Sequence, residues 1–200
     1  MKVVLASRNR GKLREIVPLL GGLELDLVTV DEVAPACELR EEGDTFEANA
    51  LAKARQAAAA TGLAAIADDS GLEVDALAGA PGVHSARYAG LPSDDARNNA
   101  KLLEALRDVP PARRGGRYRC VATYVDPVRG IEIARAGACD GEILGAPRGT
   151  GGFGYDPLFL VPALRRTMAE LPLDHKNQLS HRAAAFRALA QAMREALGPR

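Results

Sequence analysis

Apolar and polar positions in the first third of the chain predict two strands and a helix. Residues 2–6 (KVVLA) are a short β-branched run, which is typical of a strand. Residues 11–22 have apolar side chains at helical spacing and end in a glycine pair, although Pro18 disfavours the last turn. Residues 23–30 (LELDLVTV) alternate with a period of two, which predicts a second strand. An irregular acidic segment follows at residues 31–45.

The clearest helical pattern covers residues 44–62. We expect Asp44 to cap this helix, Glu47 to complete a capping box, and Gly62 to end it. Residues 63–67 (LAAIA) predict a buried strand that ends at the two adjacent aspartates, Asp68 and Asp69.

The rest of the chain predicts two helices and a pair of long strands. A helix capped near Ser93 and stopped at Pro110 is expected in residues 91–111. Residues 117–126 and 130–143 predict strands joined by a turn, and residues 181–198 predict a closing helix. Strands and helices alternate early and a strand pair comes later, so the sequence predicts an α/β fold with a mixed sheet and helices on both sides.

Composition and charge narrow the class of protein. The 200 residues contain 26 basic and 26 acidic side chains, a balance that disfavours broad electrostatic binding to nucleic acid. The three cysteines are widely spaced and fit neither a zinc site nor a disulfide framework, so we expect buried or half-buried thiols in a reducing compartment. The apolar run at the N-terminus is too short for a signal peptide or a membrane span, which favours a cytoplasmic protein.

The turn between the first strand and the first helix is a candidate phosphate site. Its sequence, SRNRGK, places Ser7, Asn9 and Lys12 beside the free amides of a helix N-terminus, and such amides attract phosphate. The segment lacks the P-loop pattern, and a plain polar turn with a solvated lysine is the alternative interpretation.

The adjacent carboxylates of Asp68 and Asp69 are candidates for metal and water chemistry. Neighbouring residues of an extended chain point in opposite directions, so one could hold Mg²⁺ while the other activates water. Glu41, Glu42 or Asp44 could supply a second ligand, and Lys53 lies on the following helix. The alternatives are an acidic turn, a solvated loop with a helix cap, and a surface lysine.

Two further segments suggest recognition of a planar base. Glycines surround Phe153 in residues 149–159 (GTGGFGYDPLF), and an aromatic ring exposed there could stack on a base. Lys176, His181 and Arg182 cluster before the last helix and could donate to a base carbonyl. The alternatives are a tight hairpin with Phe153 in the core, and a basic helix end facing solvent. Together these features describe a pocket for a nucleoside triphosphate.

Five segments, in this order, resemble the bacterial inosine/xanthosine triphosphate pyrophosphatases: LASRNRGKLREI, EEGDTFEANALAKA, ADDSGLEVDALAGAPGVHSARYAG, GTGGFGYDPLF and LSHRAAAFRAL. The resemblance spans nearly the whole chain. It implies one domain over residues 1–200, built as two lobes of an elongated mixed sheet with a central substrate cleft. It also implies a Mg²⁺-dependent homodimer that converts ITP, dITP and XTP to the monophosphate and pyrophosphate, and whose partner is this small-molecule substrate, not a nucleic acid or a membrane.

The resemblance also assigns roles to residues. Asp69 matches the proton acceptor, with Asp68 and Lys53 beside it in the catalytic group, and Glu41 and Asp69 match metal ligands. Substrate contacts are implied for Ser7, Arg8, Asn9, Arg10, Gly11, Lys12, Ser70, Phe153, Gly154, Tyr155, Asp156, Lys176, His181 and Arg182. Two other functions remain open at this point: a non-catalytic nucleotide- or RNA-binding module, and a triphosphate pyrophosphatase with another base preference.

Overall fold

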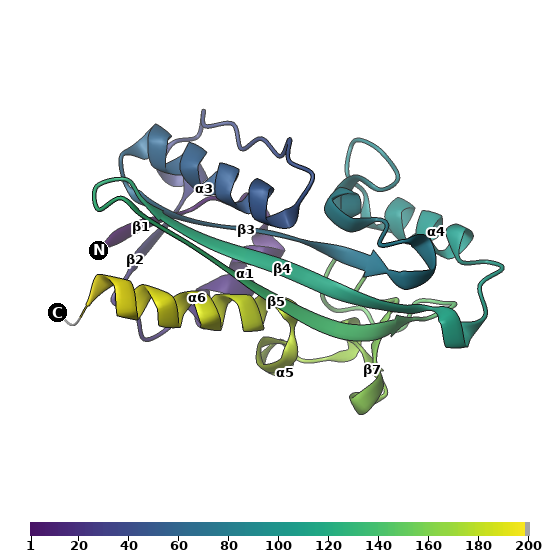
Figure 1. The fold of residues 1–200 in the computed structure, drawn as a ribbon. Coiled ribbons are helices and arrows are strands. Elements are labelled where there is room, and N and C mark those ends of the chain that lie inside the picture. The colour runs from purple at the N-terminus through teal and green to yellow at the C-terminus, as the bar shows by residue number, and fades with distance from the viewer. Residues whose placement is uncertain (199–200) are drawn as a thin grey trace. The chain divides into compact units, whose positions relative to one another are not determined.

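A computed structural model describes residues 1–198, and its strands form one seven-stranded mixed sheet in the order β2-β1-β3-β4-β5-β6-β7 (Figure 1). The β1 strand pairs in parallel with β2 and β3, whereas β6 pairs antiparallel with β5 and β7. The strands are β1 (Lys2–Leu5), β2 (Asp26–Thr29), β3 (Ala64–Val74), β4 (Gly115–Asp126), β5 (Ile131–Ile143), β6 (Phe159–Val161) and β7 (Arg166–Thr167). The predicted α/β class with a mixed sheet is confirmed.

The helices are α1 (Arg10–Leu19), α2 (Val30–Val33), α3 (Phe46–Thr61), α4 (Asp95–Ala105), α5 (Leu173–Leu179) and α6 (His181–Leu197). The chain divides into two compact units. Unit 1 contains residues 1–69, residues 120–137 and the chain from residue 181 onward, and unit 2 contains residues 70–119 and 138–180. The long strands β3, β4 and β5 each contribute residues to both units.

Unit 1 has a separate core on each face of its strands. On one face, Val3 and Leu5 of β1 and Ala64 and Ile66 of β3 pack with α1 and α6. On the other face, the alternate residues of both strands pack with the alanines of α3. Figure 1 shows α3 and α6 on opposite sides of these strands. The side-chain period of two therefore decides which helix each residue of β3 faces.

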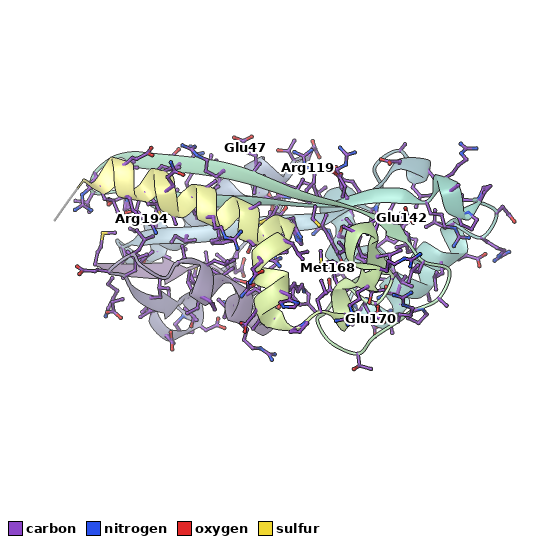
Figure 2. All side chains as sticks on the ribbon, turned by 90° about the horizontal axis from the view of Figure 1, so that it is seen from below. Glu47, Arg119, Glu142, Met168, Glu170 and Arg194 are labelled. Carbon is purple, nitrogen blue, oxygen red and sulfur yellow. The ribbon has the colours of Figure 1, made fainter. Side chains whose placement is uncertain are left out.

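Unit 2 has a core of its own. Leu72 and Val74 of β3, Leu102 and Leu106 at the end of α4, and the ring of Phe159 contribute to it. Met168 of the same core and the neighbouring Glu170 are labelled in Figure 2. The ring of Tyr118 lies 4.4 Å from that of Phe159, which joins β4 to β6 within this core.

The predicted cap of α3 is wrong by one residue. Thr45, not Asp44, caps α3: its backbone is extended, and its side chain accepts a hydrogen bond from the Ala48 amide (3.1 Å). This shift removes Glu47 from the position that a capping box requires. The cap of α4 is Asp94, beside Ser93 as predicted, but the helix ends at Ala105, well before Pro110.

The predicted end of α3 is confirmed, because Gly62 adopts φ +67°, a left-handed conformation that glycine adopts without strain.

The β3 strand does not end at the two aspartates as predicted. It continues to Val74, because the next residues resume the alternation of buried side chains at Leu72 and Val74. Residues 23–25 lie outside β2, which is shorter than predicted.

The sequence patterns missed α2, α5, β6 and β7, all of seven residues or fewer. The thiols are as predicted: Cys120 is buried, Cys37 and Cys139 are half-buried, and all three are free.

Candidate active site

The turn between β1 and α1 is organised by Asn9. Asn9 caps α1, and its side-chain oxygen accepts hydrogen bonds from the amides of Gly11 (2.9 Å) and Lys12 (3.1 Å). The Ser7 hydroxyl accepts a hydrogen bond from the Asn9 amide (3.2 Å). These contacts fix the first turn of α1 and direct Lys12 along the helix face that packs on β3.

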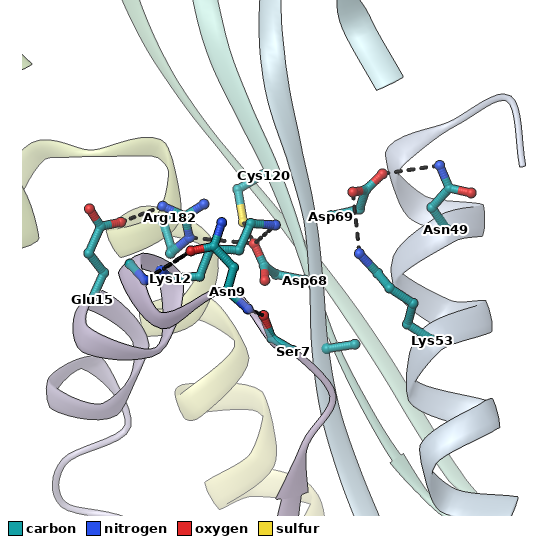
Figure 3. A network of polar contacts seen from close by, with 12 residues as sticks. Ser7, Asn9, Lys12, Glu15, Asn49, Lys53, Asp68, Asp69, Cys120 and Arg182 are labelled. Carbon is teal, nitrogen blue, oxygen red and sulfur yellow. Dashed lines mark hydrogen bonds and ion pairs between the residues drawn. The ribbon is translucent and has the colours of Figure 1, made fainter. Parts of the chain in front are cut away.

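Asp68 points from β3 toward α1 and α6 (Figure 3). One of its oxygens lies 3.1 Å from the Lys12 ammonium and 3.4 Å from Nε of Arg182. Arg182 also pairs through Nη1 with Glu15 of α1, so two cations and two carboxylates alternate in one buried cluster. The Cys120 thiol lies 3.9 Å from the same Asp68 oxygen.

The charge state of Asp68 follows from this cluster. Burial alone would raise the pKa of its carboxyl, but Lys12 and Arg182 more than offset burial and hold the pKa well below its usual range. Asp68 is therefore an ionised anchor for two cations, and the interpretation of the pair as an acidic turn is excluded.

Asp69 points from the other face of β3 toward α3 (Figure 3). Its two oxygens accept hydrogen bonds from the Asn49 amide (3.1 Å) and the Lys53 ammonium (3.4 Å). Lys53 also donates to Glu41 (2.5 Å), so two carboxylates share one buried lysine. Lys53 is therefore not a solvated surface lysine. Glu41 contacts the site through Lys53 and is not part of a fully solvated loop.

The electrostatics of Asp69 differ from those of its neighbour. Burial raises the pKa of the Asp69 carboxyl, and the opposing attraction of Lys53 and Lys12 does not fully cancel this effect. Burial would lower the pKa of Lys53, but Asp69, Asp68 and Glu41 outweigh it and raise the pKa above the usual lysine value. A charged lysine beside an acid of raised pKa is typical of a catalytic site.

The first residues of α6 are buried, which excludes the interpretation of a basic helix end facing solvent. His181 is 4% exposed and Arg182 is 2% exposed. Gly137 of β5 makes this possible, because a side chain there would overlap the His181 carbonyl oxygen and lie only 2.5 Å from the Ala185 amide nitrogen. The start of α6 can therefore press directly against the strand.

In unit 2, Asp156 organises the segment around Phe153. One Asp156 oxygen accepts hydrogen bonds from the Phe153 amide (3.0 Å) and the Lys176 ammonium (2.6 Å), and the other accepts one from the Tyr118 hydroxyl (3.2 Å). The Lys176 ammonium lies 5.0 Å from the centre of the Phe153 ring. Phe153 is half-buried in a run of turns, so it is not the core residue of a tight hairpin.

Comparisons with known proteins show the family of this chain. Residues 3–192 match the model of the Ham1 family. A dITP/XTP pyrophosphatase of Desulforamulus reducens is 51% identical over 187 residues, which cover 94% of this chain and 92% of the relative. The enzyme of that name from Escherichia coli O157:H7 is 48% identical over 96% of this chain and 98% of its own length. A solved HAM1 protein of Coxiella burnetii, 43% identical, superposes with a TM-score of 0.88 over 98% of this chain and 99% of its own.

This chain belongs to the Ham1 family. The membership confirms the family resemblance seen in the sequence motifs. The individual residue assignments stay predictions.

Three polar residues of this Ham1-family chain were not predicted from its sequence. Glu15 lies three residues after Lys12, and Asn49 lies four residues before Lys53, so each shares a helix face with a predicted residue. That spacing is the signal that could have found them. Tyr118 lies on β4 and reaches Asp156 through its hydroxyl, a contact between segments distant in sequence that no local pattern indicates.

The other residues predicted to contact substrate differ in how exposed their side chains are. Arg8 is exposed and pairs with Asp31 (2.7 Å), and it also donates to two carbonyls of residues 35–37. Ser70 is half-buried in β3. Tyr155 is buried in the core of unit 2, and its hydroxyl donates to the Ser85 carbonyl (2.8 Å). The side chain of Arg10 lies outside the described part of the structure.

Proposed function

We propose that this chain hydrolyses the deaminated purine triphosphates dITP, ITP and XTP to the monophosphate and pyrophosphate, and so removes them from the nucleotide pool. The observation that carries the proposal is the set of Ham1-family relatives about half identical to this chain over nearly its full length, which are named dITP/XTP pyrophosphatases. The buried cluster of lysines and carboxylates on β3 supports the chemistry independently.

The two aspartates have separate tasks in this proposal. Asp69 positions and activates the water that attacks the α-phosphorus, and a general base of this kind accelerates hydrolysis about 10²–10⁴-fold. Asp68 holds Lys12 and Arg182 in place. Lys12 and Lys53 then offset the negative charge of the triphosphate and of the pyrophosphate leaving group.

Magnesium is the proposed cofactor, and the residues present fit it. The carboxylates of Glu41 and Asp69 both contact the Lys53 ammonium, so two oxygen ligands of the kind that Mg²⁺ prefers lie around one point. Among residues 1–198 no group of three or more His, Cys, Asp or Glu gathers as a metal site. Two carboxylates are enough, because protein-bound Mg²⁺ keeps several waters and binds substrate phosphates. Bound there, Mg²⁺ would neutralise phosphate charge.

Base recognition is assigned to Phe153 and to donors near the last helix. The Phe153 ring would stack on the purine, which is worth about 1–3 kcal/mol per base. Lys176, His181 and Arg182 would donate to the C6 oxygen of hypoxanthine or xanthine, an atom that adenine replaces with an amino group. The adenine amino group would face these donors without an acceptor, and a buried mismatch of this kind disfavours binding strongly. In the structure Lys176 contacts Asp156, and Arg182 contacts Asp68 and Glu15, so these side chains already have fixed orientations.

We further propose a single functional domain over residues 1–200, and a homodimeric protein that acts in the cytoplasm without binding nucleic acid. The even charge balance supports the last point. In the part of the chain that the structure describes, no helix has the length and apolarity needed to cross a membrane.

The test is a substrate panel with Mg²⁺. Pyrophosphate release is measured from ITP, XTP, GTP, ATP and dUTP. We expect ITP and XTP to be cleaved with the highest kcat/KM. Preferred cleavage of dUTP would indicate a pyrophosphatase with another base preference, and binding without cleavage of any triphosphate would indicate a non-catalytic nucleotide-binding module.

A further inference from the structure

Helix α4 holds the backbone next to Phe153 through two side chains. Asp95, the first residue of α4, accepts a hydrogen bond from the Gly154 amide (2.7 Å). Asn99, one turn later, donates to the Gly154 carbonyl (2.8 Å) and to the Asp95 carbonyl (2.7 Å). Both polar groups of the Gly154 backbone are therefore bound by one face of one helix.

The Phe153 backbone is fixed from the other side by Asp156. The Phe153 amide donates to the Asp156 carboxylate (3.0 Å), and the Phe153 carbonyl accepts from the Asp156 amide (3.3 Å). Gly154 adopts φ +62°, a left-handed conformation that glycine reaches without strain, although glycine has little intrinsic preference for it over other conformations. The hydrogen bonds to Asp95 and Asp156 therefore fix the backbone conformation at residues 153–154.

The helix that carries Asp95 is itself anchored. Asn98 is 2% exposed, accepts a hydrogen bond from the Ala89 amide (2.8 Å) and donates to the Ala86 carbonyl (3.0 Å). Leu102 is fully buried in the core of unit 2. A side chain on such a rigid element can hold a loop more precisely than another loop could.

We propose that Asp95 is a positioning residue for base recognition: through the Gly154 amide it fixes the backbone turn that presents the Phe153 ring to the purine. This inference rests on the proposed function, because it takes Phe153 as the stacking ring. Acidic residues are also favoured in the first turn of a helix by the helix dipole. That preference accounts for the carboxylate at the helix end but not for its hydrogen bond to Gly154.

The first experiment measures the solvent accessibility of the ring at position 153 and does not depend on enzymatic activity. The chain has no tryptophan, so Phe153→Trp creates a single tryptophan reporter at the stacking position, whose fluorescence can be excited separately from that of the four tyrosines. In this background we expect Asp95→Ala to increase acrylamide quenching of the reporter's fluorescence, because the Gly154 amide loses the carboxylate that accepts its hydrogen bond. Asp95→Asn keeps an acceptor oxygen and should quench like the Phe153→Trp parent. Asp95 is exposed, so these substitutions remove no core packing, and circular dichroism checks that each variant is folded.

The second experiment is kinetic, in the wild-type Phe153 background. We expect Asp95→Ala to raise the KM for ITP about fivefold while kcat stays nearly constant, because a mobile ring must be ordered on binding. Asp95→Asn should restore the KM. Asp94→Ala is the matched control: it removes the cap of α4, a hydrogen bond to the Arg97 amide (2.8 Å), and so weakens the helix without touching Gly154.

The proposal is overturned if Asp95→Ala leaves quenching and KM unchanged, if Asp95→Asn behaves like Asp95→Ala, or if Asp94→Ala shifts both readouts as much. A wild-type protein that releases no pyrophosphate from ITP would instead refute the proposed function. The quenching measurements would still decide whether Asp95 positions the ring.

Discussion

Asp68 and Asp69 are identical side chains at consecutive positions, and the pleat of β3 gives them opposite surroundings. Residues 64 and 66 of β3 face the core with α1 and α6, so Asp68 continues that face. Residues 65 and 67 face the alanines of α3, so Asp69 continues the other face. The repulsion expected between adjacent carboxylates is relieved by a separate set of cations on each side.

Substitution should separate the two roles. We expect Asp69→Asn to lower kcat for pyrophosphate release about 10²–10⁴-fold while the protein still binds nucleotide, because the amide cannot take a proton from water. We expect Asp68→Asn to cost roughly 3–5 kcal/mol of unfolding free energy, since it breaks a buried ion pair with Arg182, which keeps Glu15. It also removes the carboxylate that faces the half-buried Lys12.

Asp69→Asn should cost much less stability, because Lys53 keeps its contact with Glu41 (2.5 Å). Urea denaturation and steady-state kinetics on both variants check the two expectations. Full turnover by Asp69→Asn would remove it as the base, and equal losses of stability would contradict the anchoring role of Asp68.

At the scale of elements, two glycines of the segment before Asp156 offer a matched pair of substitutions. Gly152 and Gly154 have φ of +73° and +62°, so alanine is strained at either position. A side chain at Gly152 would overlap the Asp156 carboxylate, whereas one at Gly154 meets no atom within 4 Å. We expect Gly152→Ala to raise the KM for ITP well above that of Gly154→Ala, because it displaces the carboxylate that binds the Phe153 amide and Lys176. Equal KM values for the two variants would show that the Asp156 carboxylate does not fix the conformation of this segment.

A second prediction at this scale concerns the turn after β7. Hydrogen bonds from Arg148 and from the Thr167 amide lower the pKa of Glu170 to about 2. Because the folded-state pKa lies below the unfolded value of about 4.3, the stabilisation is present above that value and is lost as the pH falls toward 2. We expect the wild type to lose more stability than Glu170→Gln between pH 5 and pH 2.5 in urea denaturation. The same substitution at exposed Glu47 is the control, and identical acid sensitivity of wild type and Glu170→Gln would contradict the prediction.

The sequence was sufficient for elements whose pattern is long and local. The strands β1, β4 and β5 and the helices α1, α3 and α6 follow their predicted ranges closely. Short elements such as β6, β7 and α5 were missed, because two to seven residues show no clear period. The β3 strand was cut short because two charges look like a strand end, and the cations that allow it to continue come from α1, α3 and α6.

The same limit applies to the candidate site. The motifs predicted Asp68, Asp69, Lys53 and Phe153 as site residues, since each lies in a distinctive local sequence. The partners of these residues, such as Glu15 for Arg182 and Tyr118 for Asp156, are 167 and 38 residues away along the chain. Helical spacing could place Glu15 on the same face as Lys12, but its pairing with Arg182 and the contact of Tyr118 with Asp156 depend on tertiary packing, which a single sequence does not reveal.

At the scale of the whole molecule, the residues assigned to the triphosphate and those assigned to stacking belong to different compact units. Lys12, Lys53 and Asp69 are in unit 1, and Phe153, Asp156 and Lys176 are in unit 2. Fragments of the nucleotide should report separately on the two sets of residues: pyrophosphate on Lys12, Lys53 and Asp69, and the base of IMP on the stacking ring of Phe153 and on the proposed base donors.

This expectation can be tested with Asp69→Asn as the background, so that ITP is bound without being cleaved. Isothermal titration calorimetry with Mg²⁺ then measures the affinities for pyrophosphate, IMP and ITP. We expect Lys12→Ala to lower the affinities for pyrophosphate and ITP. Phe153→Ala should lower the affinities for IMP and ITP about tenfold and leave the affinity for pyrophosphate unchanged, because stacking contributes only to binding of the base. The exposed His84→Ala of unit 2 is the control and should alter none of the three. A Phe153→Ala variant with unaltered ITP affinity would mean that the Phe153 ring does not stack on the base, and base recognition would then have to come from the donors Lys176, His181 and Arg182.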